Sequence, residues 1–218
     1  MNFSFVFSRA FLLSLSGAIG FALIAIWVGD KRIDNFDRMI ISKIQGAESA
    51  GLTALMKLFT FIGSGVIVSV LAIAMLVVLI KLHERRLLLF YGGVLIGSAL
   101  LNSVLKSIFH RLRPTLHRII EVNGYSFPSG HSMAAFTFYG IITFLLWKHI
   151  PNVYARVALI AVGSILILAI GISRIYLGVH YPSDIVGGYL ASGTWLAASI
   201  GLYQYILERR QRKIKVRA

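Results

Sequence analysis

The chain contains no cysteine and few acidic residues. The absence of cysteine among 218 residues excludes a disulfide framework, thiolate zinc sites, iron–sulfur clusters and a cysteine nucleophile. Charged residues make up only 14% of the chain, compared with about 25% in an ordinary soluble domain. Hydrophobic residues reach 57%, and the mean hydropathy is +0.80. This composition excludes a disordered chain and is atypical of a water-soluble globule, so we predict a polytopic membrane protein.

The scarcity of acidic residues also makes the chain strongly basic. Lys and Arg number 22 against 8 Asp and Glu, which gives a net charge of +14. Basic residues commonly hold loops on the cytoplasmic side of a membrane, and they also suit an anionic lipid headgroup or a phosphate. No nucleic acid partner is predicted, because no basic stripe with interleaved aromatic residues lies outside the apolar segments.

Six apolar stretches predict the fold. A helix that crosses the bilayer needs roughly 20 mostly apolar residues. Six stretches free of Asp, Glu, Lys and Arg have about this length: 10–29, 58–80, 87–105, 129–147, 157–173 and 185–207. The first is longer than the apolar core of a signal peptide, about 7–15 residues, so we predict an uncleaved helix. We therefore predict an all-α bundle of six transmembrane helices, forming one integral-membrane domain over residues 1–218.

The connecting segments predict the orientation. Residues 208–218 form a basic tail, which favours a cytoplasmic C-terminus. Six spans then place the N-terminus on the same side. The loops after the first, third and fifth spans lie on the outer side.

The segment of residues 30–50 shows the periodicity of an interfacial helix. Its apolar residues recur at i, i+3, i+7 and i+11, on one face of a helix: Ile33, Phe36, Ile40 and Ile44. Asp34 with Asp37 resembles a weak N-terminal capping arrangement. A simple connector between the first two spans is an equally good interpretation.

The first group of unusual polar residues follows the third span. Lys106 and Arg113 are seven residues apart, which corresponds to two turns on one face of a helix, and Pro114 would end that helix. Two cations on one face at the mouth of a bundle can clamp a phosphate. Alternatively, they are snorkelling side chains at a helix end.

The second group precedes the fourth span. Pro128 and Gly130 indicate a tight turn just before a helix that begins near Ser129. The free N–H groups of that helix start suit an anion. His131 is placed to donate a proton to a leaving oxygen. The alternative is a capped helix start with an incidental histidine.

The third group follows the fifth span, which ends at Arg174. His180 and Asp184 are four residues apart, so they can meet on one helical turn or across the Tyr-Pro turn between them. A carboxylate bonded to one imidazole nitrogen fixes the tautomer and leaves the other nitrogen nucleophilic. The alternative is a surface salt bridge in a loop.

All three groups fall in loops that the six-span arrangement places on one side of the membrane. Ionisable residues at a membrane are candidates for a functional site. Three cations, two histidines and one carboxylate suit phosphoryl transfer, because the cations supply the charge that Mg²⁺ would otherwise supply. We predict no metal or other cofactor, since the outer loops lack the acidic cluster of a two-metal site.

The three groups together resemble the signature motifs of the type 2 phosphatidic acid phosphatase superfamily. The matching residues occur in the same order as in these motifs: Lys106, Arg113, Pro114, Pro128, Ser129, Gly130, His131, Ser173, Arg174, His180 and Asp184. The six-helix membrane subfamily is similar over nearly the whole chain. This combination is far more specific than any one of the motifs.

The resemblance implies a role for each residue. His180 would be the nucleophile that forms a phosphohistidine, with Asp184 orienting it. His131 would protonate the leaving lipid alkoxide and then serve as base for the hydrolytic water. The phosphoryl oxygens would be bound by the remaining residues: Lys106, Arg113, Arg174, Ser129 and the backbone N–H of Gly130. Arg111, beside the first motif, is a further candidate.

The resemblance also implies a substrate class and a location. We expect a metal-independent phosphatase acting on a lipid phosphate at the outer face of a bacterial plasma (inner) membrane, without an obligate protein partner. Gly130 stands where a subset of undecaprenyl pyrophosphatases carries Asp, which favours a glycerophospholipid phosphate as substrate. Phosphatidylglycerol phosphate is the preferred candidate. Undecaprenyl pyrophosphate and phosphatidic acid are the alternatives.

Two other functions fit parts of the pattern. Vanadium haloperoxidases share the superfamily pocket, but they are soluble and this chain has six apolar spans. A non-enzymatic lipid or phosphate transporter would only bind its ligand. Transporters often show repeats or broken helices near the membrane midplane, whereas the polar groups here lie at one surface.

Overall fold

The computed structural model describes residues 3–217, with side chains from residue 9 to residue 212, and its regular secondary structure over this range consists of helices alone. The helices are α1 (Phe3–Gly29), α2 (Asp34–Gln45), α3 (Ala50–Ile62), α4 (Gly65–Lys81), α5 (Arg85–Phe109), α6 (Gly130–Trp147), α7 (Val153–Tyr176) and α8 (Pro182–Arg217). No β-strand occurs among the described residues. The predicted all-α class is confirmed.

Five of these helices are long and apolar enough to cross a membrane, and α3 with α4 makes a sixth bent span. The chain is therefore a multi-pass membrane protein. The predicted second span, 58–80, falls across a break in this bent span, where α3 and α4 meet at an angle of 45°. Ser64 caps α4 by accepting a hydrogen bond from the Ile67 amide, and a Cβ at Gly63 would lie 2.4 Å from Ile170 of α7. The helical path is therefore interrupted between α3 and α4 by a helix cap and by close packing against α7. Neither feature is visible in the distribution of charged residues along the sequence.

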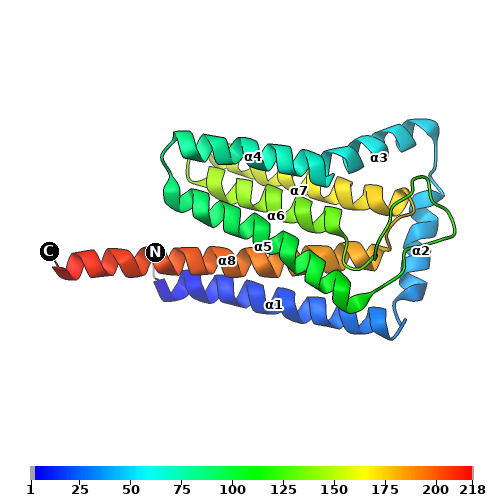
Figure 1. The fold of residues 1–218 in the computed structure, drawn as a ribbon, viewed down its shortest axis with the longest axis horizontal. Helices are drawn as coiled ribbons and strands as arrows, with labels where there is room; N and C mark the ends of the chain where they lie inside the picture. Colours follow the sequence, from blue (N-terminus) through cyan, green and yellow to red (C-terminus); the bar gives the residue numbers. More distant parts are fainter. Residues whose placement is uncertain (1–2, 218) are drawn as a thin grey trace.

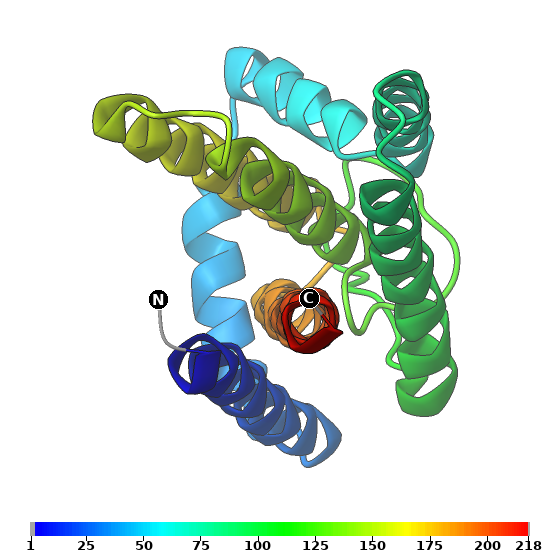
Figure 2. The same cartoon turned by 90° about the vertical axis from the view of Figure 1, so that its left-hand side faces the viewer.

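The long helices run side by side, and α2 lies across one end of the bundle (Figure 1). α1 packs along α8, and α6 contacts α5, α7 and α8. Seen along the bundle, α8 lies among the other helices, with α1 on one side of it (Figure 2). The first turn of α8 is consequently buried, which matters because it carries Asp184.

The apolar side chains divide between the core and the outer surface. One buried cluster joins α4, α5, α6 and α8: Leu79, Tyr91, Val94, Ile141, Leu145 and Leu196. Other large apolar side chains point outward, such as Val66 and Leu89, which are 73% and 78% exposed. So large an apolar exterior fits contact with lipid rather than water.

The interfacial helix α2 is present, but its predicted details are partly wrong. Ile33 is buried as expected, whereas Phe36 is 44% exposed. The N-cap of α2 is Ile33, without a side-chain cap hydrogen bond, so the predicted capping by Asp34 and Asp37 does not occur. Asp37 is instead only 1% exposed, because it points into the bundle and binds the start of α8.

Candidate active site

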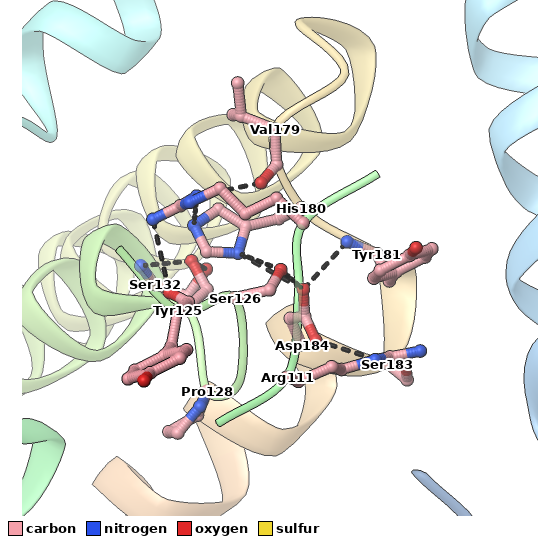
Figure 3. A network of polar contacts seen from close by, with 12 residues as sticks. Arg111, Tyr125, Ser126, Pro128, Ser132, Val179, His180, Tyr181, Ser183 and Asp184 are labelled. Carbon is pink, nitrogen blue, oxygen red and sulfur yellow. Dashed lines mark hydrogen bonds and ion pairs between the residues drawn. The ribbon is translucent and has the colours of Figure 1, made fainter. Parts of the chain in front are cut away.

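The three predicted polar groups meet at the end of the bundle that α2 crosses. α5 and α7 end there, α6 and α8 begin there, and the loop of residues 110–129 joins α5 to α6 (Figure 1). Figure 3 shows the polar network between this loop and the start of α8. Groups from distant parts of the sequence therefore share one site.

The start of α8 fixes His180 and Asp184 relative to each other. Pro182 is the first helical residue, a position where its missing N–H costs nothing. The Tyr181 amide donates to Asp184 Oδ2 at 2.9 Å, as in a capping box. His180 Nδ1 lies 3.2 Å from the same oxygen. Of the two predicted geometries, the pair thus meets across the Tyr-Pro turn.

The hydrogen bonds of His180 define its tautomer. Arg113 Nη1 lies 2.9 Å from His180 Nε2, and an arginine can only donate. Nε2 must therefore be the unprotonated nitrogen, and Nδ1–H donates to Asp184. This leaves the Nε2 lone pair directed toward the cationic side of the site, as a nucleophile requires.

Burial also keeps His180 neutral. The side chain is 2% exposed, and loss of solvation lowers its pKa to about 4. Asp184 opposes this shift, whereas the charges of Arg113 and Arg174 add to it. At neutral pH the imidazole therefore carries no charge and its lone pair is available.

Lys106 and Arg113 converge, although not on one helical face as predicted. α5 ends at Phe109, because His110 adopts a left-handed conformation with φ of 47°. Arg113 therefore lies in the loop. Lys106 Nζ and Arg113 Nη2 both donate to the Tyr125 carbonyl, at 3.0 and 3.3 Å.

The second predicted group forms the start of α6. Ser129 is the N-cap, and its own amide donates to the Asp184 carbonyl at 3.0 Å, which ties α6 to α8. His131 lies in the first turn, partly buried, within electrostatic range of His180 and the surrounding cations. His131, in the first turn of α6, and His180, in the turn before α8, thus lie within electrostatic range of each other.

Arg174 is the most deeply buried cation of the site. It is 2% exposed, and its Nη1 donates to Thr60 of α3. Its Nε and Nη2 atoms are buried and have no hydrogen-bond partner. Leaving such donors unsatisfied costs about 1–3 kcal/mol or more each. An anion with several oxygens could accept hydrogen bonds from both of them.

Three residues of this network were not predicted from the sequence, Ser126, Asp37 and Ser183, and Arg111 lies elsewhere than its motif suggested. Ser126 donates to Asp184 Oδ2 and lies 3.3 Å from His180 Nδ1. Asp37 accepts from both the amide and the hydroxyl of Ser183. Arg111 contacts Asp184 rather than the cationic side of the site. Ser126 lies next to a predicted motif, but no local signal identified Asp37.

A cavity of about 350 Å³ opens beside this site between α4, α5 and α6. Its lining includes Gly130 and Asn102 near the site and smaller or apolar residues such as Val68, Ala72 and Leu95. Four hydroxyl side chains also line this cavity: Ser69, Ser98, Ser103 and Thr137. Among the described residues, no three His, Asp or Glu side chains are grouped to hold a metal ion.

Comparisons with known proteins agree with the motifs. The model of the PAP2 superfamily matches residues 87–208, which include every predicted site residue. Phosphatidylglycerophosphatase B of Bacillus subtilis is 40% identical over 111 residues, covering 50% of this chain and 53% of that protein. An undecaprenyl-diphosphatase of Sulfolobus acidocaldarius is 32% identical over 93 residues, covering 41% of this chain and 38% of that protein. The matches thus span about half or less of these relatives.

A solved structure extends the likeness to most of the fold. The crystal structure of a transmembrane PAP2-type phosphatidylglycerolphosphate phosphatase from Bacillus subtilis superposes with a TM-score of 0.79 and 26% identity. The superposition covers 87% of this chain and 95% of that one.

Proposed function

Because the chain belongs to the PAP2 superfamily, we propose that it is a membrane-embedded lipid phosphatase that hydrolyses a phospholipid phosphate monoester. The observation that carries this proposal is that Arg174 and His180 are both buried in one site. Two buried guanidinium donors without a protein partner lie within electrostatic range of a buried neutral imidazole. A phosphoryl group satisfies both, because its oxygens accept from the cation while its phosphorus meets the lone pair.

The proposed first step is attack of His180 Nε2 on phosphorus. The N–P bond forms as the bond from phosphorus to the lipid oxygen breaks, and His131 gives its proton to that oxygen. Asp184 holds Nδ1–H and stabilises the positive charge on the imidazole. In the second step a water, deprotonated by His131, attacks phosphorus and releases inorganic phosphate from His180.

The cations stabilise the charge on the transferring group. Arg113 Nη1 donates to His180 Nε2 in the absence of substrate. When a phosphoryl group binds, one of its oxygens would accept this hydrogen bond instead, which makes the Nε2 lone pair available for attack. Lys106, Arg174, the Ser129 side chain and the Gly130 amide complete the proposed set of donors. Their charge makes a metal ion unnecessary in this scheme.

Phosphatidylglycerol phosphate is the proposed substrate. The support is the 40% identity to a phosphatidylglycerophosphatase B and the likeness to a PAP2 phosphatase structure of the same stated activity. The apolar part of the cavity beside Gly130, which Val68, Ala72 and Leu95 line, is where an acyl chain would lie. Undecaprenyl pyrophosphate is the second candidate, because a relative of 32% identity is named for that activity.

The proposed location is the plasma (inner) membrane, with the site outside and both termini in the cytoplasm. The absence of cysteine makes this testable with single introduced thiols. Leu116→Cys, in a loop position that is 96% exposed near the site, should react with a membrane-impermeant maleimide on intact cells. Glu84→Cys, between α4 and α5, should react only after lysis; the reverse pattern contradicts the orientation.

The test of the function is phosphate release in detergent with excess chelator. Phosphatidylglycerol phosphate, phosphatidic acid and undecaprenyl pyrophosphate are compared, with His180→Ala as the blank. We expect release that survives chelation and is lost in His180→Ala, while the variant still binds lipid. Binding without release in the wild-type chain would instead indicate a transporter, for which the broken α3–α4 span would be suitable.

A further inference from the structure

Arg111 lies between two buried carboxylates that come from opposite ends of the sequence. Its Nη1 donates to Asp184 Oδ1 at 2.7 Å, and its Nη2 donates to Asp37 Oδ2 at 2.8 Å. Its guanidinium also stacks 4.0 Å above the ring of Tyr181. The side chain of Arg111 is only 12% exposed, and the two carboxylates are 1% exposed or less.

Arg111 binds the carboxylate oxygen of Asp184 that does not face His180. Oδ2 of Asp184 already faces His180 Nδ1, Ser126 and the Tyr181 amide. Oδ1 accepts from Arg111, which fixes the rotation of the carboxylate about its last bond. Arg111 also supplies the positive charge that a buried carboxylate needs if it is to stay ionised.

Asp37 in turn holds both Arg111 and the helix that carries Asp184. Its Oδ1 accepts from the Ser183 amide at 2.9 Å, one of the free donors of the first turn of α8. Its Oδ2 accepts from the Ser183 hydroxyl at 2.6 Å and from Arg111. Burial alone would lower the pKa of Arg111, but Asp184 and Asp37 raise it above its usual range.

We infer that Arg111 and Asp37 are positioning residues, which act through Asp184 to hold His180 in its nucleophilic tautomer. Figure 3 shows Arg111 on one side of Asp184 and His180 on the other. Neither contacts the cationic side of the site, where the phosphoryl group would bind. Asp37 lies on the interfacial helix, outside the segment that matches the family model. The inference rests on the phosphatase function proposed above.

The test compares Asp37→Asn with Asp34→Asn. The control removes the same charge from the same turn of α2, but Asp34 lies 3.9 Å from Arg111 and is 37% exposed. Loss of the partners that orient histidines at metal sites typically costs about 10- to 100-fold in activity, and Asp37 orients its site by the same kind of contact, so we expect Asp37→Asn to lower kcat by about tenfold or more. KM should stay within about twofold, because phosphate binding is untouched. Asp34→Asn should match the wild type.

Three further variants separate positioning from folding. Arg111→Gln should lower kcat at least as much as Asp37→Asn, and Arg111→Lys should restore part of it, since the charge returns without the planar fork. Asp37→Asn should add little in the Arg111→Gln background, because both act along one chain of contacts. Asp37→Asn retains an acceptor for the Ser183 amide, so it should fold even where Asp37→Ala does not.

The outcomes are distinct. Equal kcat in Asp37→Asn and Asp34→Asn overturns the inference, as does a loss confined to KM or a loss matched by the fraction of unfolded protein. A wild-type chain that releases no phosphate from any lipid contradicts the proposed function itself and removes the basis of the inference with it.

Discussion

Replacing Gly178 with alanine tests how firmly the turn before His180 is held. Gly178 has a φ of +73°, and a Cβ placed there would lie 1.8 Å from the His117 carbonyl oxygen and 3.0 Å from Arg118 Cα. These obstacles are backbone atoms of a segment whose Ile119 amide donates to the Leu177 carbonyl at 3.1 Å. No change of rotamer relieves the clash, so the two segments must separate.

The expected cost follows from two contributions. An alanine at this positive φ costs roughly 1–2 kcal/mol. Forcing an added methyl group into a closely packed position costs about 1–3 kcal/mol more. The free energy of unfolding should therefore fall by roughly 2–5 kcal/mol, which for a chain of this length lowers the thermal midpoint by roughly 4–20 °C. His180 lies two residues further on, so kcat should fall even in the folded fraction.

Gly124→Ala is the matched control. Gly124 also has a positive φ, +82°, but a Cβ there meets nothing within 4 Å. Gly124→Ala should lose only the conformational contribution of roughly 1–2 kcal/mol, which lowers the thermal midpoint by roughly 2–8 °C. Thermal unfolding followed by tryptophan fluorescence in detergent measures both variants. Equal midpoints would show that contact with His117 does not fix the turn, and the reasoning would be refuted.

Three further predictions concern the chemistry. Because burial lowers the pKa of His180 to about 4, the imidazole is neutral above that pH and protonated below it. The acid limb of kcat/KM, corrected for substrate ionisation, should therefore lie near that value, and a limb at the usual value of about 6.5 would contradict the burial argument. Arg174→Lys keeps the charge but loses the planar donor fork, so inhibition by orthovanadate should weaken about 10- to 100-fold, and unchanged inhibition would remove Arg174 from the phosphate site. Ser126→Ala removes a donor to Asp184, so initial rates should show kcat reduced about three- to tenfold at constant KM; an effect on KM alone would place Ser126 at the substrate instead.

The sequence predicted the fold class because long charge-free stretches leave few other structures in a membrane. The break between α3 and α4 was not predictable in the same way. It depends on the Ser64 cap and on the packing of Gly63 against Ile170, which is more than 100 residues away along the chain.

The residues of the site show the same contrast between local patterns, which the sequence reveals, and long-range contacts, which it does not. His180 and Asp184 are four residues apart, so local geometry alone restricted how they could meet. Lys106 and Arg113 were expected on one helix, but the left-handed His110 ends α5 between them, and they converge through the Tyr125 carbonyl. Asp37 could not be predicted, because its partner Ser183 lies 146 residues away and the contact exists only in the folded bundle.

The hydrogen bond from Arg174 to Thr60 has a consequence for recombination within the family. The segment that matches the family model begins at residue 87. Arg174, the most buried cation of the site, nevertheless forms its hydrogen bond with Thr60 of α3, which lies before that segment. Gln45 of α2 likewise donates to the Tyr176 carbonyl near the end of α7. Chimeras with a crossover near residue 87 would inherit the reactive groups without the partners that orient them. The exchangeable unit is the whole bundle, and a shuffled library should yield active members mainly where the N-terminal helices and the matched segment share one parent.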